Sequence, residues 1–394
     1  MKIITYKIQV VNGKVLITDS TGEHIASNDP TELLEFLIEP YENTIKIFWS
    51  LDDTIAPVLR TLGEKICKRL AMIKKSYCPP VNIFYVPRKV FSLTHVASRE
   101  IKSDFYGIDQ YFPEVRAPGT PEEIHMLGEK LLYELAKMGL RPSKLTSPIA
   151  IYEQCVMSQL DLPTAKDMPQ EASKYAMLCS GKLWIEAYKL GHWPIAFDYD
   201  IKSSFPSILM TLKDIRMMNW IKSEQYMSMA EYGYADCLCT IYDHVKVSPV
   251  VVMNEDGSSS TPTGTFPMYL RKQKIDFIRH WNIGEVKIID GWWAIPKIKN
   301  IPAPLALPLF HLLKYKERTG LQSLLAKAMS VGIYGKTGEQ HSDGVGDYFN
   351  PCWFAETSDE ITLQVAEFIY QNKLQEHLIH VSVDGVLLDC EVKL

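Results

Sequence analysis

The chain opens on two runs of apolar and β-branched residues, which favour β-strands. The run that ends at Val11 is followed by Asn12 and Gly13 and then by a second run over 14–18, so a β-hairpin is predicted here. A helix, a strand and another helix after this hairpin would make a mixed sheet with helices packed against it. We predict these three elements near 31–38, 44–49 and 53–73.

The clearest helical segment lies over 120–139. Thr120 can cap its first turn, Pro121 suits the first helical position, and acidic residues at 122–123 favour the helix dipole. Gly139 is a typical helix terminator. We therefore predict a helix that ends at this glycine.

Prolines punctuate the stretch from about 140 to 172, which indicates a boundary between domains. A chain of 394 residues is also too long for one ordinary core, so two or three domains are expected. The elements predicted after the boundary are a helix at 171–190, a strand at 194–200, a helix beginning near Pro206, strands within 234–253, a helical arm over 304–333 with a break at Gly320, a helix at 358–375 and strands within 379–388.

Composition narrows the class of protein. Hydrophobic residues make up 46% and charged residues 23% of the chain, which is typical of a globular protein. No apolar run is long enough to cross a membrane, and the N-terminus carries no cleavable signal, so we expect a cytoplasmic rather than a secreted protein.

The eight cysteines form no CxxC pattern, which favours buried thiols over a zinc site or disulfides. The net charge of −5 excludes only a generic nucleic-acid coat, because phosphate binding needs a local basic surface.

The first segment with candidate chemistry is 197–208. An apolar strand ends at Asp198 and Asp200, whose side chains share one face, and the chain then turns at Pro206 into a helix. A carboxylate at a strand end beside a turn suits magnesium and a triphosphate. The alternative is an aspartate that merely caps the helix.

The second segment is 324–336, which is predicted to be helical. Lys327 and Tyr334 are seven residues apart, so they share one helix face, and Gly335 is predicted to end the helix. The pair suits a triphosphate and the base above it. The alternative is an apolar core helix with an exposed lysine head group.

The third segment is 378–388, where two apolar strands flank Asp384 and Gly385 at a predicted hairpin turn. The strands would hold the Asp384 carboxylate at a fixed point. The alternative is that Asp-Gly serves only as turn chemistry.

Together the three segments resemble family B DNA polymerases, and in particular the compact phage and mobile-element members. The first family motif, D-x-x-S-L-Y-P-S-I, is matched by Asp200-Ile-Lys-Ser-Ser-Phe-Pro-Ser-Ile208. The second, K-x-x-x-N-S-x-Y-G, is matched by Lys327, Tyr334 and Gly335, and the third, D-T-D-S, in part by 382–385. A weaker similarity to the template-contacting Y-x-G-G linker lies at 179–186.

The resemblance implies a role for each matched residue. Asp200, Asp384 and the main-chain carbonyl of Ile201 would bind Mg²⁺ or Mn²⁺, in two ions, and Lys327 would act on the triphosphate. The nucleotide would further contact Ser203, Phe205, Lys314, Arg318 and Tyr334, with the Phe205 ring as the steric gate against ribose. DNA would contact Ser180, Gly181, Lys182, Gly335 and Lys336.

The resemblance also implies the domain order of an α/β and α+β multidomain protein. We expect an RNase H-like, exonuclease-like domain at 1–150, a template-contacting linker at 151–190, and a polymerase palm at 191–394 with fingers helices at about 304–335. The exonuclease motifs are degenerate, since Tyr6, Lys7 and Ile8 stand where D-x-E is expected, so no proofreading is predicted. An alternative metal site of Asp19, Glu23 and Asp53 stays open.

Three departures from the family bear on activity. Val331 and Gly332 replace Asn-Ser in the second motif, and Ser382 replaces the first acid of the third. The sequence ends at Leu394, shortly after that motif and before the thumb of the family, so either a C-terminal part is absent from this chain or the protein is a shortened relative that needs a partner for the thumb or clamp function.

The predicted function is template-directed synthesis of DNA from dNTPs, on a primer or a priming protein, in the host cytoplasm if the protein is phage-encoded. The alternative is an inactive polymerase-like scaffold that binds nucleic acid or replication partners. An RNA-synthesising variant is disfavoured by the ring of Phe205.

Overall fold

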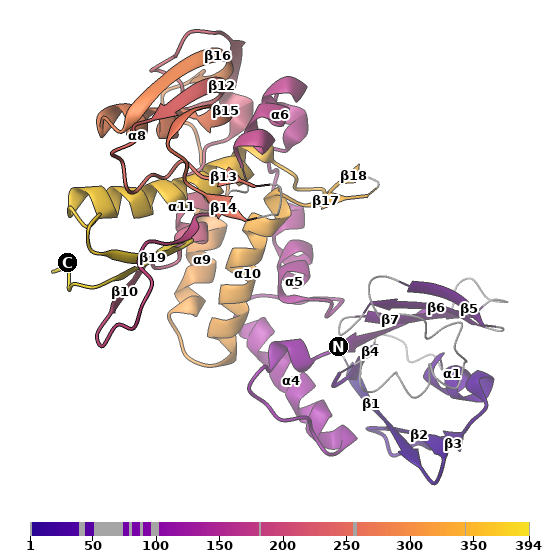
Figure 1. The fold of residues 1–394 in the computed structure, drawn as a ribbon. Helices are drawn as coiled ribbons and strands as arrows, with labels where there is room; N and C mark the ends of the chain where they lie inside the picture. Colours follow the sequence, from indigo (N-terminus) through magenta and orange to yellow (C-terminus); the bar gives the residue numbers. More distant parts are fainter. Residues whose placement is uncertain are drawn as a thin grey trace. The chain divides into compact units, whose positions relative to one another are not determined.

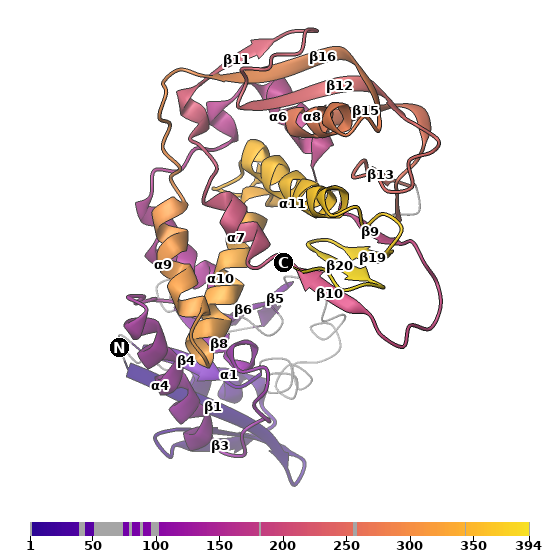
Figure 2. The same ribbon diagram turned by 90° about the vertical axis from the view of Figure 1, so that its left-hand side faces the viewer.

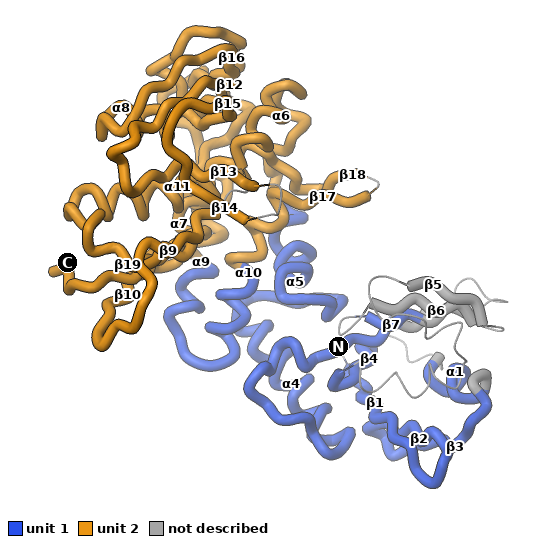
Figure 3. Tube along the Cα trace, in the orientation of Figure 1, with its two compact units in different colours: residues 1–159, 312–329 blue, residues 160–311, 330–394 orange. Residues whose placement is uncertain are grey.

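The computed structural model describes residues 2–38, 44–50, 74–78, 81–86, 90–95, 102–180, 183–254, 258–342 and 344–393. The chain divides into two compact units, coloured blue and orange in Figure 3. Unit 1 comprises 1–159 and 312–329, and unit 2 comprises 160–311 and 330–394. Among the described residues, no helix is both long and apolar enough to cross a membrane.

Unit 1 is built on an eight-stranded sheet in the order β3-β2-β1-β4-β8-β7-β6-β5. β1 is parallel to β4 and β4 to β8, whereas the other neighbours are antiparallel. The predicted hairpin of β1 and β2 is confirmed, with Asn12 and Gly13 at its turn. The strands are β1 (Lys2–Val11), β2 (Lys14–Asp19), β3 (His24–Ser27), β4 (Thr44–Phe48), β5 (Lys74–Cys78), β6 (Val81–Val86), β7 (Val90–His95) and β8 (Lys102–Gly107).

The sheet of unit 1 has buried side chains on both faces. Helix α4 packs on the face that carries Ile3 and Ile47. On the opposite face the rings of Tyr6, Phe48 and Phe105 pack together with centroids 5.5–5.8 Å apart, and Tyr6 also meets Phe36 of α1. A Cβ atom at Gly128 would lie 2.5 Å from the Ile47 Cδ1 atom, so a larger residue there would require the Ile47 side chain to shift. α4 runs over Pro121–Lys137, and the described part of this unit also contains the helices α1 (Pro30–Ile38) and α5 (Pro148–Cys155).

The predicted start of α4 is confirmed in detail. Thr120 Oγ1 accepts a hydrogen bond from the Glu123 amide, and the Glu123 carboxylate accepts one from the Thr120 amide, which is a capping box. Gly139 follows the helix with a φ of +77°. These signals are local, and the sequence alone therefore places this helix to within two residues.

Unit 2 contains two four-stranded sheets, ordered β11-β16-β12-β15 and β10-β20-β19-β9. Every pairing in them is antiparallel. The strands are β9 (Ile185–Ala187), β10 (Phe197–Asp200), β11 (Met218–Lys222), β12 (Tyr232–Ile241), β15 (Gly264–Arg271), β16 (Gly284–Pro296), β19 (Leu378–Ser382) and β20 (Gly385–Leu388), with the short hairpins β13 (Val252–Met253) to β14 (Ser259–Ser260) and β17 (Gln340–His341) to β18 (Gly344–Val345).

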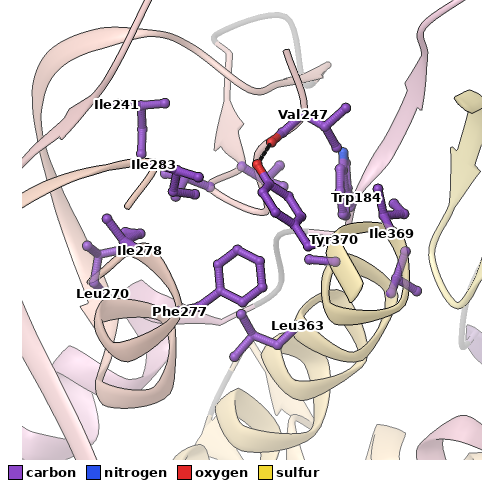
Figure 4. Close-up of a cluster of buried hydrophobic side chains, with 14 of the residues drawn as sticks. Trp184, Ile241, Val247, Leu270, Phe277, Ile278, Ile283, Leu363, Ile369 and Tyr370 are labelled. Carbon is purple, nitrogen blue, oxygen red and sulfur yellow. Dashed lines mark hydrogen bonds between the residues drawn. The ribbon is translucent and has the colours of Figure 1, made fainter. Parts of the chain in front are cut away.

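Helix α11 (Pro351–Gln371) lies between these two sheets in both ribbon views (Figures 1 and 2). Its apolar side chains join one buried cluster with both sheets and with α8 (Lys272–His280). Figure 4 shows Leu363, Ile369 and Tyr370 of α11 within this cluster, and the Tyr370 hydroxyl donates a hydrogen bond to the Val247 carbonyl. The remaining helices of unit 2 are α6 (Gln170–Cys179) and α7 (Ser204–Leu209).

The predicted helical arm is a pair of helices, α9 (Ala306–Lys316) and α10 (Leu321–Thr337). Gly320 separates them with a φ of +78°, a left-handed conformation that glycine adopts without steric cost. The predicted break at this residue is confirmed. Each helix has one end in unit 1 and the other in unit 2.

Several predicted boundaries are wrong. The helix expected over 171–190 ends at Cys179 and is followed by β9, and the helix expected at 358 begins at Pro351. α10 continues past Gly335 to Thr337. The hairpin turn consists of residues 383–384, one residue earlier than expected, because Gly385 already pairs with Ser382. The helix predicted at 53–73 lies outside the described residues.

The described cysteines are free thiols, as the sequence predicts, and most of them are buried. Burial raises the pKa of Cys237 to about 12 and of Cys239 to about 11, so both stay protonated near neutral pH.

Candidate active site

Two strands of unit 2 bring Asp200 and Asp384 together. Asp200 is the last residue of β10 and lies opposite Gly385, the first residue of β20. The Ile201 amide donates a hydrogen bond of 2.9 Å to the Asp384 carbonyl, which continues the pairing beyond the strand. A Cβ atom at Gly385 would lie 3.3 Å from Asp200 Oδ1, so the glycine leaves the carboxylate close against the hairpin. The two predicted metal-binding acids are therefore neighbours.

The hairpin turn that carries Asp384 has an unusual backbone. Val383 has a φ of +57°, which is sterically costly for a β-branched residue. Its amide donates a hydrogen bond of 2.9 Å to the Trp184 carbonyl, and Trp184 itself is buried. The surrounding contacts thus hold the turn in a backbone conformation that is unfavourable for valine.

The segment after Asp200 turns sharply into α7. Ser203 lies in the left-handed region with a φ of +57°, and Ser204 begins the helix. Ser204 is 3% exposed, and its hydroxyl donates a hydrogen bond of 2.5 Å to Asp384 Oδ2. No local pattern singles out Ser204, because the contact joins residues that lie 180 positions apart in the chain.

A cavity of about 210 Å³ opens beside the two aspartates. Its lining comes from β10, the β19–β20 hairpin and α11, and includes Asp200, Ile201, Gln364, Phe368 and Asp384. Carboxylate and main-chain carbonyl oxygens are the ligands that Mg²⁺ and Mn²⁺ prefer. The donor set at this cavity therefore fits a hard divalent cation.

Three aromatic rings from α7, α10 and α11 pack against one another. The ring centroids of Phe205 and Tyr334 are 4.7 Å apart, and those of Tyr334 and Phe354 are 4.8 Å apart. Burial raises the pKa of Tyr334 to about 12, so its hydroxyl stays protonated. The structure brings together the two predicted nucleotide-binding rings and adds Phe354, which lies outside the motifs considered in the sequence.

The predicted phosphate-binding cations lie on the helical arm. Lys314, Arg318 and Lys327 are exposed and belong to unit 1. The Arg318 guanidinium donates to Gln322 Oε1 and lies over the ring of Tyr315, with 4.7 Å from its central carbon to the ring centroid. Lys327 and Tyr334 share α10, as predicted, and their common role stays a prediction.

Comparison with known proteins finds a similarity of fold and no similarity of sequence to a known family. Neither the protein-family models nor the curated proteins contain a match. Among solved structures, Phi29 DNA polymerase complexed with primer-template DNA and incoming nucleotide substrates matches at a TM-score of 0.66 and 12% identity, over 99% of this chain and 80% of that chain. Its binary complex with primer-template DNA matches at 0.60 and 12% identity, over 100% of this chain and 81% of that chain. The fold is that of a family B DNA polymerase.

Three of the five predicted DNA-contacting residues lie among the described residues. Ser180 ends α6, and its hydroxyl donates to the Met177 carbonyl at 2.8 Å. Lys336 forms an ion pair of 3.0 Å with Glu339, and Gly335 lies inside α10. Gly181 and Lys182 fall outside the described residues. The DNA contacts of all five residues stay predictions.

Glu186 on β9 is a structural centre that sequence reasoning missed. Its carboxylate accepts hydrogen bonds from Trp184 Nε1 at 3.2 Å, the Tyr188 hydroxyl at 2.7 Å and Thr261 Oγ1 at 2.8 Å. Burial, aided by this carboxylate, raises the pKa of Tyr188. Glu186 lies on β9, the edge strand of the sheet whose β19–β20 hairpin carries Asp384, and its bond with Thr261 connects the loop before β15 to this strand.

The acids considered for a separate site in unit 1 have structural roles where they are described. Asp19 is buried, and its Oδ1 atom accepts hydrogen bonds from the Thr21 amide, the Thr21 hydroxyl and the Glu23 amide. Such a pattern holds the turn between β2 and β3. Asp53 lies outside the described residues.

One further group of donors comes together only in three dimensions. Among the described residues, His377, Asp389 and Cys390 place ligand atoms within 4.8 Å of one another at the base of the β19–β20 hairpin. The Asp389 carboxylate already pairs with Lys189 at 2.5 Å and with His377 at 2.8 Å, which lowers its pKa. These pairs tie the two ends of the hairpin together.

Proposed function

We propose that this chain catalyses template-directed DNA synthesis by transferring deoxynucleotides to a 3′-hydroxyl. The observation that carries the proposal is the adjacency of Asp200 and Asp384 beside a cavity, on a fold shared with a polymerase captured with primer-template DNA and incoming nucleotide. Such a reaction needs little covalent chemistry from the protein and depends on positioning and charge stabilisation.

In this proposal the residues of the site have two roles, binding of metal ions and binding of the nucleotide. The carboxylates of Asp200 and Asp384 and the carbonyl of Ile201 would hold Mg²⁺ or Mn²⁺. When bound, two such ions orient the attacking 3′-hydroxyl and stabilise the charge of the leaving pyrophosphate. The Phe205 and Tyr334 rings would bind the sugar and the base, and Lys327 would bind the triphosphate.

Residues 1–150 are proposed to be an RNase H-like domain that has lost proofreading. The mixed sheet with its central parallel strands supports the first part of this proposal. For the second part, Tyr6 and Ile8 occupy buried positions of β1 where the family carries acids. A tyrosine and an isoleucine offer no carboxylate for a metal ion.

Primer extension by the full chain with dNTPs and Mg²⁺ or Mn²⁺ tests the proposal. Asp200→Asn and Asp384→Asn should each lower the rate at least about 100-fold, because each removes a charged ligand from the reaction centre. Glu224→Gln is the matched control, since it removes an exposed carboxylate next to β11 in the same unit and should leave the rate unchanged. Equal rates for the wild type and both aspartate variants would overturn the proposal.

A second candidate, a DNA-binding scaffold without catalysis, is favoured by Ser382, which leaves the hairpin with one acid. It predicts that the wild type incorporates no nucleotide but binds primer-template DNA, and that Asp200→Asn binds it equally well. Fluorescence anisotropy with labelled DNA, run beside the extension assay, separates the two candidates.

A further inference from the structure

We propose that Ser204 is a positioning residue that orients the Asp384 carboxylate for binding a divalent cation. The inference rests on the proposed function, because it assigns a role at the same site. Ser204 occupies the place where the resembling polymerase motif has an apolar leucine, so a buried hydroxyl stands here in place of a hydrocarbon side chain.

The contact has the geometry of a strong hydrogen bond. The distance from Ser204 Oγ to Asp384 Oδ2 is 2.5 Å, within the range of O–H···O⁻ bonds to an ionised carboxylate. Ser204 is 3% exposed, so water competes little for its hydroxyl. The left-handed conformation of Ser203 turns the chain immediately before it and sets the start of α7 beside the hairpin.

Asp384 has few other constraints on its side chain. It lies in a two-residue turn and is partly exposed. In the part of the chain that the structure describes, the bond from Ser204 is the one side-chain hydrogen bond to this carboxylate. The main chain is held separately by the Ile201 amide, which fixes the Cα position but not the rotation of the carboxylate.

The hydroxyl therefore selects one orientation of the carboxylate. With Oδ2 held by Ser204, the other carboxylate oxygen of Asp384 would be available to a divalent cation. A hairpin with a second acid has two carboxylates to attract and place a cation, whereas this hairpin has Ser382 in that place. Orientation of the remaining carboxylate then matters more, and groups that orient metal ligands typically contribute about 10–100-fold to metal affinity.

Binding of Mn²⁺ to the full chain, followed by the electron paramagnetic resonance signal of the free ion, tests the inference without relying on catalysis. Ser204→Ala removes the hydroxyl, and Ser204→Cys keeps nearly the same volume with a much weaker donor. Both variants should bind Mn²⁺ at least about tenfold more weakly than the wild type. Thr211→Ala is the matched control, because its hydroxyl lies just after α7 and donates to the Ile208 carbonyl, and the affinity of this variant for Mn²⁺ should be unchanged.

Primer extension supplies a second readout that a merely structural role would not move. In Ser204→Ala the metal concentration for half-maximal rate should rise about tenfold, while the rate at saturating metal returns toward the wild-type value. A loss of folded protein would instead lower the rate at every metal concentration. Thermal unfolding of each variant checks that it is folded.

The outcomes separate this inference from the proposed function. If Asp384→Asn weakens Mn²⁺ binding but Ser204→Ala and Ser204→Cys bind as the wild type does, the role of Ser204 is overturned and the metal site stands. If Asp384→Asn also binds as the wild type does, the metal site itself is wrong. If Ser204→Cys restores the affinity lost in Ser204→Ala, packing rather than the hydrogen bond explains the effect, and the inference fails.

Discussion

The ring of Phe205 on α7 packs against the ring of Tyr334 on α10, with 4.7 Å between the centroids and 46° between the planes. Tyr334 is held from its other face by Phe354 at 4.8 Å and 16°. The packing of these two rings holds the Phe205 side chain in place. A side chain that excludes the ribose 2′-hydroxyl by steric contact needs such a fixed position.

Replacing the Phe205 ring should relax the choice of sugar. Phe205→Ala is expected to reduce the preference for dNTP over rNTP roughly tenfold or more, because steric exclusion of one small group is worth about this factor. Phe205→Tyr keeps the ring and should keep the preference. The measurement is kcat/KM for single-nucleotide incorporation of each sugar, and an unchanged ratio in Phe205→Ala would refute the role.

The strain at Val383 predicts a stabilising substitution. Val383→Gly removes the side chain that makes a φ of +57° costly, and should raise the free energy of unfolding by about 1 kcal/mol after the entropy cost of glycine. Val383→Ala keeps a Cβ atom and should gain less. Urea unfolding of the three proteins measures the order, and a destabilised glycine variant would show that the valine side chain contributes more by packing than it costs.

Arg271 is the cation on which the buried charges of α11 depend. It is 2% exposed and pairs with Glu356 at 2.7 Å, Asp359 at 3.0 Å and Glu360 at 2.6 Å. Arg271→Met should cost about 3–5 kcal/mol of unfolding free energy, since it leaves the buried Glu356 carboxylate without its cationic partner. Lys222→Met breaks the exposed pairs of a surface lysine and should cost less than about 1 kcal/mol. Urea unfolding measures the loss of unfolding free energy in each variant. Similar losses in Arg271→Met and Lys222→Met would contradict the expectation that the burial of an ion pair determines how much stability is lost when it is broken.

Glu356 should make stability depend on pH near neutrality. Burial raises the pKa of Glu356 from its usual 4.5 to about 7, against the opposing effect of Arg271. The folded state then binds this proton more tightly than the unfolded state, so the contribution of Glu356 to stability falls as the pH rises from about 4.5 to 7. Glu356→Gln removes that dependence.

The test compares unfolding free energies of the wild type and Glu356→Gln at pH 5 and pH 8. Relative to the variant, the wild type should lose stability at the higher pH, and the other titrating groups cancel in the difference. The same difference at both values would mean that the carboxyl ionises at its ordinary pKa.

The degenerate motif in unit 1 predicts the absence of proofreading. The full chain, given Mg²⁺ and a primer with a mismatched 3′ end, should release no terminal nucleotide, because Tyr6 and Ile8 provide no metal ligands. Gel analysis of the end-labelled primer measures this, with a proofreading polymerase as the positive control. Excision of the mismatch by this chain would show that acids elsewhere in it form an exonuclease site.

The start of α11 is a boundary that the apolar pattern of the sequence does not predict. Glu356 and Asp359 interrupt the apolar pattern of this helix, and the sequence predicts a helix only from 358, whereas the helix begins at Pro351. In the structure both carboxylates are buried, since Arg271 and Lys274 from β15 and α8 pair with them. A helix buried on nearly every side has no polar face to set its period, and its partners lie in segments that are remote along the chain.

The sequence by itself determined the features whose causes are local. The cap of α4 at Thr120, the hairpin turn at Asn12 and Gly13, and the break at Gly320 follow from the conformational preferences of a few adjacent residues. The placement of Asp200 and Asp384 at the ends of apolar strands belongs to the same group, because it follows from a local apolar pattern and a turn.

Only the tertiary structure decided how these pieces meet. The bond from Ser204 to Asp384 and the packing of Phe354 behind Tyr334 join segments that no local preference relates. Such contacts depend on strand register and helix packing, in which many weak interactions across the fold set each side chain's position together. The positions of Asp200 and Asp384 beside apolar strands can therefore be predicted from the sequence, whereas the side chains that contact them cannot.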